Sequence, residues 1–305
     1  MPSLKAIRNR IGSIKNTRKI TRAMKMVSAA KLRRAQEAII AARPYAAALS
    51  KVVSELSAVA GPESHPLFQS HDTTGRKERI ALVLFTSDRG LAGGLNSGVI
   101  KAAERAIREE FVGCEISLRT IGKKSNGHFT RRNANVISFD LAPTGPTALT
   151  LARETSSVII DDFMNDKVDR VFAIYNEFKS AISQTVTMKQ VLPVIPEVLS
   201  VADKAKAAAS VVEHGEKANV DFIYEPSKQE LLTRLVPQYV QIGLYRAALE
   251  NIASEFGARM TAMENATNNA GDIIGRLTLQ YNRARQASIT KELLEIIGGA
   301  EALKG

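Results

Sequence analysis

Apolar residues near the start of the chain recur with the spacing of one face of an α-helix. The steps alternate between three and four positions, which predicts an amphipathic helix over the first 60 residues or so. Ser3 stands where an N-cap is expected, and Pro44 should kink or locally disturb the helix because it lacks an N–H group. The apolar stripe consists of Leu4, Ile7, Ile11, Ile14, Ile20, Met24 and Val27, and continues at Ala35, Ile39, Ala42, Leu49, Val53 and Leu56.

A second helical stripe occupies the end of the chain, from about residue 226 to residue 297. Twelve positions follow a strict three-four alternation over about five heptads, which is typical of a coiled-coil seam. Poor helix formers interrupt it at Pro237, Gly243, Gly257, Gly271 and Gly275, and a closely packed partner helix would account for the glycines. The twelve positions are Leu249, Ala253, Phe256, Met260, Met263, Thr267, Ala270, Ile274, Leu277, Tyr281, Ala284 and Ser288.

Between the two stripes the pattern changes to short apolar runs that alternate with helical spacing. Strands are predicted at residues 80–86, 115–121, 136–139, 170–175 and 185–192, the last of them an edge strand before Pro193. Helices are predicted at 95–111 and 147–164, and a polar helix or loop at 123–133. Alternating strands and helices imply a mostly parallel sheet covered by helices.

These elements predict a mixed α/β plus all-α fold. Each long helix exceeds the ~30 Å width of a middle domain of this size, so the two stripes are expected to be buried against each other. The prediction is an antiparallel coiled coil of the N- and C-terminal helices with an inserted Rossmann-like α/β domain. The expected division is an N-terminal helix (1–60), a linker (61–78), an α/β foot domain (79–195), a variable connection (196–225) and a C-terminal helix (226–305).

The net charge of +11 is concentrated in one part of the chain. Residues 1–57 contain 13 lysines and arginines but only two acidic residues, Glu37 and Glu55, whereas the remainder is neutral. Such a segment indicates a partner with an acidic surface. A mitochondrial transit peptide and a nucleic-acid-binding helix remain alternatives, but the long continuous periodicity favours a basic helix that binds an acidic protein surface.

Composition excludes several classes of protein. With 45% hydrophobic residues the chain can form a core, and its apolar runs are too short for a membrane-spanning helix. A single cysteine, Cys114, excludes an intrachain disulfide framework and favours a reducing, intracellular compartment.

No residue pattern predicts a catalytic, cofactor or metal site. The glycine-rich segment 87–96 follows a strand and opens a helix, but its spacing matches neither common phosphate-binding motif, so a tight turn is expected. The four histidines (His65, His71, His128 and His214) are scattered without metal-ligand spacing. Asp161 and Asp162 point in different directions on a helix and are expected to be solvated. We therefore expect a protein that is not itself an enzyme.

Four segments resemble the gamma subunit of the rotary F-type ATP synthases. They are residues 3–34, the turn 87–96, residues 258–263 and residues 281–299, in the order that the family has them. This chain has Ala92 where the family's turn often has cysteine. The lone Cys114 also excludes the regulatory cysteine pair of the chloroplast type.

The resemblance implies a non-catalytic rotor shaft. Its coiled coil enters a ring of three alpha and three beta subunits, and its foot rests on the epsilon subunit and the membrane c-ring. The shaft couples proton translocation to ATP synthesis or hydrolysis on the beta subunits. No nucleic acid, cofactor or small-molecule substrate of its own is implied. The expected location is the bacterial plasma membrane, peripherally on the cytoplasmic side.

The family's contact positions match residues of this chain. Met24 and Lys25 match the segment that faces an acidic loop of a beta subunit, and Arg259 matches a shaft position implicated in coupling. Near the C-terminus, the segment held by a catch loop of beta contributes Arg285, Gln286, Thr290 and Glu292. The class-level alternatives are a basic coiled-coil protein that binds nucleic acid and an α/β nucleotide-binding enzyme that uses the glycine-rich turn.

Overall fold

The computed structural model describes residues 3–195 and 227–302, and the chain divides into two compact units. One unit is Met1–Ala30 with Arg259–Gly305, here called unit 1; the other is Lys31–Ala258, called unit 2. The two long helices, α1 (Leu4–Ala60) and α6 (Lys228–Ala302), contribute to both units. The variable connection expected at 196–225 lies outside the described residues, and the five-segment division stays a prediction.

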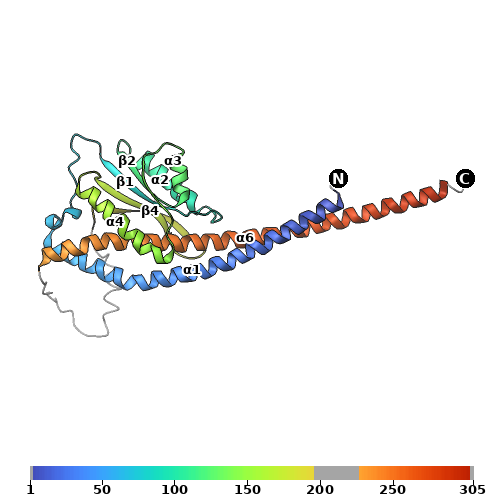
Figure 1. The fold of residues 1–305 in the computed structure, drawn as a ribbon, viewed down its shortest axis with the longest axis horizontal. Helices are drawn as coiled ribbons and strands as arrows, with labels where there is room; N and C mark the ends of the chain where they lie inside the picture. The colour runs from blue at the N-terminus through green and yellow to red at the C-terminus, as the bar shows by residue number, and fades with distance from the viewer. Residues whose placement is uncertain (1–2, 196–226, 303–305) are drawn as a thin grey trace, which may run out of the picture. The chain divides into compact units, whose positions relative to one another are not determined.

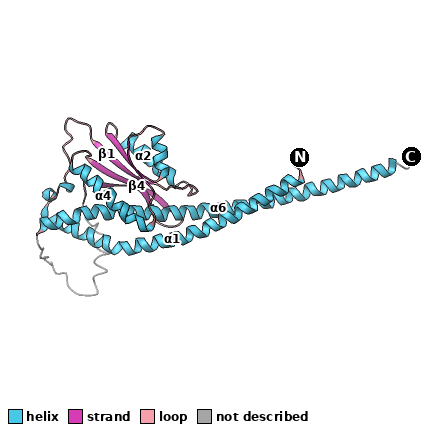
Figure 2. Cartoon of the chain, in the orientation of Figure 1, coloured by secondary structure: helices cyan, strands magenta, loops and turns pink. Residues whose placement is uncertain are grey.

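Unit 2 contains a five-stranded sheet in the order β3-β2-β1-β4-β5. Its strands are β1 (Arg79–Phe85), β2 (Glu115–Ile121), β3 (Val136–Asp140), β4 (Arg170–Phe178) and β5 (Gln184–Leu192). Strands are magenta in Figure 2, where β1 and β4 are labelled. The first four pair in parallel, and β5 pairs with β4 in the antiparallel direction. A mostly parallel sheet with β5 as an edge strand, as the sequence predicts, is confirmed.

Helices cover both faces of this sheet, because parallel strands are joined by long crossover connections that are usually helical. Figure 1 shows α2 (Leu95–Arg105) and α3 (Lys123–Thr130) on one face, with α4 (Ala148–Met164) and α6 on the other. The core of the first face combines alternate strand residues with Val99, Ala103 and Phe129 from the helices. Alternate strand side chains point to opposite faces, so β1, which is covered on both, is apolar along most of its length.

The predicted helix at 95–111 differs from the structure at its end. Helix α2 stops at Arg105 and continues as a single π-helical segment, η3 (Ala106–Glu110). Three short 3-10 turns complete the described elements: η1 (Pro62–Ser64), η2 (Pro66–Phe68) and η4 (Gly145–Thr147). Within residues 61–78, Leu67 is buried and its carbonyl accepts a hydrogen bond from the N–H of Val194.

A buried carboxylate ties residues 76–79 to the start of β4. Asp169 is 2% exposed and accepts hydrogen bonds from the Arg76 guanidinium (Nη2–Oδ1, 2.6 Å), the Arg79 guanidinium (Nη2–Oδ1, 3.0 Å) and the Arg79 backbone N–H (2.8 Å). Burial raises the pKa of Asp169, but the hydrogen bonds from Arg76 and Arg79 outweigh it and leave the pKa well below its usual range. The carboxylate is therefore charged at neutral pH.

The expectation that α6 is buried only against the other long helix is wrong for unit 2. Eight consecutive residues, 247–254, are buried, which requires neighbours on more than one side of the helix. On one side Asn251 and Ser254 form hydrogen bonds with Asn176 of β4. On another, Lys31 of α1 lies 5.3 Å from the ring centroid of Phe256. Six of the eight residues at 247–254 are small or apolar, the exceptions being Glu250 and Asn251, and this composition is the sequence signal for burial on two sides.

Close helix packing does not explain the glycines of α6. A Cβ on Gly257 would lie 3.3 Å from the backbone of Ala181, in the β4–β5 connection rather than in a helix. A Cβ on Gly271 would lie 3.7 Å from the Arg18 side chain, which is an ordinary van der Waals distance. Apart from the backbone of its own helix, a Cβ on Gly243 or Gly275 would have no other atom within 4 Å among the described residues. The prediction from these glycines is therefore wrong.

Candidate functional site

The two long helices pair in antiparallel fashion within unit 1. The hydroxyls of Thr21 and Thr267 are 2.7 Å apart, and Lys25 Nζ donates to Glu264 Oε1 at 2.6 Å. From the first pair to the second, the residue number rises by four on α1 and falls by three on α6, so the two helices run in opposite directions. Ser3 is the N-cap of α1, as predicted, because its Oγ accepts a hydrogen bond from the Ala6 N–H at 3.3 Å.

The buried stripe of α1 differs from the prediction at its centre. Ile20 and Val27 are 60% and 57% exposed, whereas Thr21 and Ser28 are 8% and 2% exposed. Ser28 Oγ donates to the Met24 carbonyl at 2.8 Å, so this hydroxyl can be buried without losing its hydrogen bond. Hydrophobicity alone therefore misplaces the seam by one residue in this segment.

The seam of α6 agrees with the prediction. All twelve positions from Leu249 to Ser288 are buried or half-buried. Within unit 1, Met263, Ala270 and Leu277 are the most buried of them. Helix α1 also continues through Pro44 without ending there.

The candidate contact residues fall into two groups. Met24 and Lys25 are half-buried on α1, and Arg259 of α6 is only 8% exposed. The other four, Arg285, Gln286, Thr290 and Glu292, are all exposed on α6. The structure thus makes the second group available to a partner, whereas Arg259 is largely covered.

The register of the two helices explains this exposure. Thr21 faces Thr267 and Lys25 faces Glu264, so with equal rise per residue Leu4 comes level with about residue 285. Beyond that point α6 continues to Ala302 without α1 beside it, and residues 289–299 are all exposed. Exposed apolar residues in this part of α6 include Leu293, Leu294, Ile296 and Ile297.

The basic residues at the start of α1 are exposed and mostly without acidic neighbours. Between Lys5 and Lys25, only Lys25 forms an ion pair with a described residue of the chain. The others are therefore free to act on an external acidic surface, with their field little reduced by the chain itself. They are Lys5, Arg8, Arg10, Lys15, Arg18, Lys19 and Arg22.

The glycine-rich turn after β1 is held together by its own residues. The Asn96 side chain accepts a hydrogen bond from the Ser87 N–H and donates one to Ser87 Oγ, both at 2.8 Å. Gly93 has a positive φ of 57°, which glycine adopts without strain. These contacts support the tight turn expected from the sequence.

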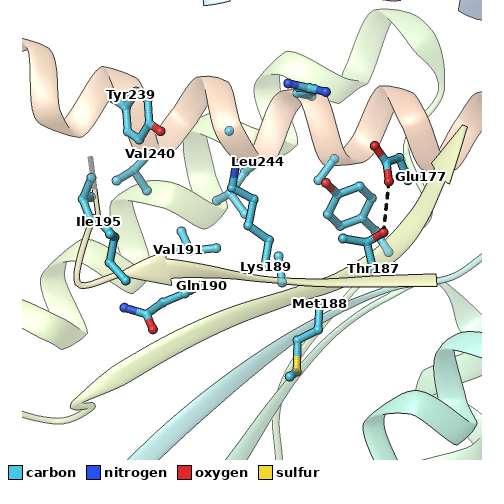
Figure 3. A pocket seen from close by; sticks show the side chains of 16 residues that line it. Glu177, Thr187, Met188, Lys189, Gln190, Val191, Ile195, Tyr239, Val240 and Leu244 are labelled. Carbon is cyan, nitrogen blue, oxygen red and sulfur yellow. Dashed lines mark hydrogen bonds between the residues drawn. The ribbon is translucent and has the colours of Figure 1, made fainter. Parts of the chain in front are cut away.

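A pocket of about 440 Å³ lies in unit 2 between β5 and α6. Figure 3 shows Lys189 extending from the strand toward Leu244 of the helix, with Tyr239 and Ile195 at one end. At the other end Thr187 donates to Glu177 at 3.3 Å (Figure 3). The lining combines Lys189 and Arg246, the Glu177 carboxylate, the Thr187 hydroxyl, two tyrosines, Gln190 and apolar residues, and it contains no histidine, cysteine or serine.

The remaining reactive side chains have structural surroundings. Burial, more than the neighbouring Glu78 carboxylate, raises the pKa of the Cys114 thiol, which disfavours the reactive thiolate. Asp162 is not solvated as expected, because it forms ion pairs with Arg119 and Lys167. Among residues 3–195 and 227–302, no cluster of three or more histidine, cysteine, aspartate or glutamate side chains could hold a metal ion.

Comparison with known proteins gives full-length matches. A family model described as ATP synthase matches residues 3–303. The ATP synthase gamma chains of Geobacter metallireducens and Geotalea daltonii are 46% and 47% identical to this chain, and each alignment covers 100% of both chains. A solved structure of the Tetrahymena thermophila mitochondrial ATP synthase, described as central stalk/cring, contains a chain that is 26% identical with a TM-score of 0.56. That match covers 81% of this chain and 99% of the other.

The chain belongs to the ATP synthase gamma chain family. It is therefore a component of the ATP synthase complex, which is associated with a membrane. Within the described residues, none of the helices is both long and apolar enough to cross a bilayer. A gamma chain with exposed basic residues on one helix and an exposed end on the other has surfaces suited to other subunits.

Sequence reasoning missed two parts of this gamma chain's surface. The Lys25–Glu264 pair could not be found without the register, since the two residues are 239 positions apart and the sequence gives no local signal for their contact. The second part is the end of α6 beyond about residue 285, where α1 no longer lies beside it, and it follows from the same register. The only sequence signal for this exposed end was the unequal length of the two predicted helices.

Proposed function

We propose that this chain is the central rotor shaft of an ATP synthase, without a catalytic site of its own. Its full-length identity to ATP synthase gamma chains carries the proposal. The alpha–beta ring and the c-ring are its partners, together with the epsilon subunit. The shaft acts peripherally on the cytoplasmic side of a bacterial plasma membrane.

The structure suggests how such a shaft transmits a conformational signal. A single rod within a threefold ring contacts each beta subunit with a different side, and different contacts bias the open and closed forms of each subunit differently. Shifting a subunit from almost wholly open to almost wholly closed requires about 5.5 kcal/mol of differential interaction. Exposed cations on α1 and the bulk of the two helices are the groups that supply it.

Each group of candidate residues has its own proposed role. Met24 and Lys25 present a short stretch of α1 to an acidic loop of a beta subunit. Arg285, Gln286, Thr290 and Glu292 provide exposed hydrogen-bonding groups on the part of α6 that extends beyond α1. Arg259 is buried, so its proposed role in coupling is to hold the shaft's shape rather than to reach a partner.

The nucleic-acid alternative has little support. Its main basis was the excess of basic residues in α1, whereas the full-length identity of this chain is to ATP synthase gamma chains. The alternative of a nucleotide-binding enzyme relied on the glycine-rich turn. In that turn the backbone N–H and the hydroxyl of Ser87 form hydrogen bonds with the Asn96 side chain.

The proposal is tested with Arg285→Ala combined with Gln286→Ala in the assembled complex. Both side chains are exposed, so we expect a normally folded chain with weakened torque transfer or assembly and a several-fold loss of coupled ATP synthesis. Arg276→Ala with Gln280→Ala is a matched control of the same composition, also exposed on α6. Unchanged ATP synthesis in membranes, or equal losses in both variants, would contradict the proposed contact.

A further inference from the structure

The outer edge of β3 is an unprotected sheet edge. The strand is the last of the sheet on that side, and among the described residues nothing pairs with its outer edge. Natural edge strands are usually blocked by lysine, proline or a covering segment. The sequence Val136-Ile137-Ser138-Phe139-Asp140 contains neither lysine nor proline, whereas the opposite edge strand β5 carries Lys189 and is followed by Pro193.

Apolar side chains are exposed along this edge. Ile137, Phe139 and Leu141 are 46%, 42% and 57% exposed, and they alternate along the chain as residues on one face of a strand do. A shallow groove of about 460 Å³ runs beside the strand, with Asn126, Thr130, Asn133 and Ala134 forming its other side. An extended chain placed there would find both backbone partners and apolar contacts.

The surroundings of the groove are basic. Residues 117–140 contain five lysines and arginines and one acidic residue, Asp140, which is exposed at the end of β3. Arg119 and Arg132 are paired, with Asp162 and Glu104 respectively. The exposed Lys123, Lys124 and Arg131 form no ion pair with a described residue. Lys123 and Arg131 therefore carry unneutralised positive charge at the two ends of α3, next to β3, whereas the Lys124 amine lies by Gly90 in the turn after β1.

We propose that β3 and α3 form a docking surface for an acidic, extended polypeptide of a partner protein, which adds to the sheet as a further strand. Main-chain hydrogen bonds to β3 provide affinity, and the basic residues select an acidic sequence. The same charge disfavours a second copy of this chain, because two β3 edges would bring like charges together. This surface is separate from the long helices on which the proposed rotor contacts lie.

The proposal is tested on the full chain with a fluorescent peptide of alternating glutamate and valine. Because the basic residues of α1 also attract acidic peptides, a peptide of equal charge with a central proline measures non-specific binding. We expect the first peptide to bind more tightly and to slow amide hydrogen exchange at residues 136–140. A lysine–valine peptide should not bind.

Charge reversal then tests the basic residues. Lys123→Glu with Arg131→Glu should weaken binding by about tenfold or more at low salt, since both are exposed and form no ion pair with a described residue. Arg34→Glu with Arg43→Glu, two exposed cations of α1 in the same unit, makes the same change of charge and is the control, which should leave the affinity unchanged. Equal binding of the proline peptide, protection away from β3 or no effect of the Lys123 and Arg131 reversal would each overturn the proposal.

Discussion

At the scale of single residues, Gly122 shows how one position fixes the carboxyl ends of β1 and β2. Its φ is +100°, and a Cβ there would lie 2.3 Å from the backbone oxygen of Thr86. Thr86 is itself fixed, since its N–H donates to the Ile121 carbonyl at 2.8 Å and its hydroxyl lies 2.8 Å from that of Ser125. Neither the glycine nor its neighbour has room to move.

Gly122→Ala should therefore destabilise unit 2 by about 3 kcal/mol, because strain from the positive φ adds to a clash with backbone. Amide hydrogen exchange of β1 and β2 in the full chain measures the loss. Gly145→Ala is the control, since a Cβ there meets nothing within 4 Å. If the amides of β1 and β2 were equally protected in the two variants, the ends of these strands would tolerate a Cβ at position 122, and the prediction would be wrong.

Asp169 leads to a prediction about pH. Its pKa is lower in the folded chain than in the unfolded one, so its contribution to stability is present above the unfolded pKa near 4 and is lost as pH falls below it. We expect Asp169→Asn to lose about 3 kcal/mol at neutral pH, since Arg76 and Arg79 lose their carboxylate. The difference from the parent chain should shrink in acid. Unfolding measured from pH 7 to pH 3 tests this, and a constant difference would contradict it.

At the scale of elements, the seam of unit 1 combines apolar and polar positions. Thr21 and Thr267 share a hydrogen bond across the helices, and each also lies within hydrogen-bond reach of a carbonyl of its own helix. Buried hydroxyls of this kind restrict the register because they must meet their partner. The apolar residues of the seam would pack in several registers equally well.

Thr21→Val should weaken the pairing of the helices by about 1 kcal/mol, because Thr267 then lacks its cross-helix partner. In the Thr21→Val background, Thr267→Val should cost less than it does in the parent chain, since the hydrogen bond between the two helices is already lost. Hydrogen exchange of the amides of residues 15–30 follows the pairing. Thr278→Val provides the control, as that hydroxyl bonds only to the Ile274 carbonyl of its own helix among the described residues. Additive effects of the two seam substitutions would argue against coupling.

Periodicity predicted these elements well where burial follows hydrophobicity. The strands, α4 and the twelve positions of the α6 seam are where the spacing puts them. Prediction failed where burial does not follow hydrophobicity. Thr21 and Ser28 can be buried because their hydroxyls keep hydrogen bonds to carbonyls of their own helix. Residues 247–254 are buried because a second surface covers them. The contact with Glu264 depends on long-range register, which one sequence does not reveal. The roles of Met24, Arg259 and the exposed end of α6 remain predictions that only the family resemblance supplied.

At the scale of the whole molecule, charge is distributed for contact with other subunits rather than for stability. The excess of +11 lies within residues 1–57, and most of the cations between Lys5 and Lys25 have no acidic partner among the described residues. Exposed ion pairs contribute at most about 1 kcal/mol each. Their absence therefore costs this chain little, while the unneutralised charge remains available to a partner.

Lys25 is the exception, and it allows two explanations of a charge effect to be separated. Under the proposed contact, Lys25→Glu would repel an acidic loop of a beta subunit, but it would also repel Glu264 within the chain. The double variant Lys25→Glu with Glu264→Lys restores an ion pair between the helices. We expect the single variant to impair coupling of ATP hydrolysis to proton pumping.

If the lysine acts on a partner, the double variant should remain impaired, because α1 still presents a negative charge at position 25. Glu264→Gln alone is the control and should be close to the parent, since an exposed pair contributes little to the fold. Proton pumping in membrane vesicles, compared with ATPase activity of the same preparation, measures coupling. Full recovery in the double variant would show instead that Lys25 matters through its contact with Glu264, and that its charge does not reach the beta subunit.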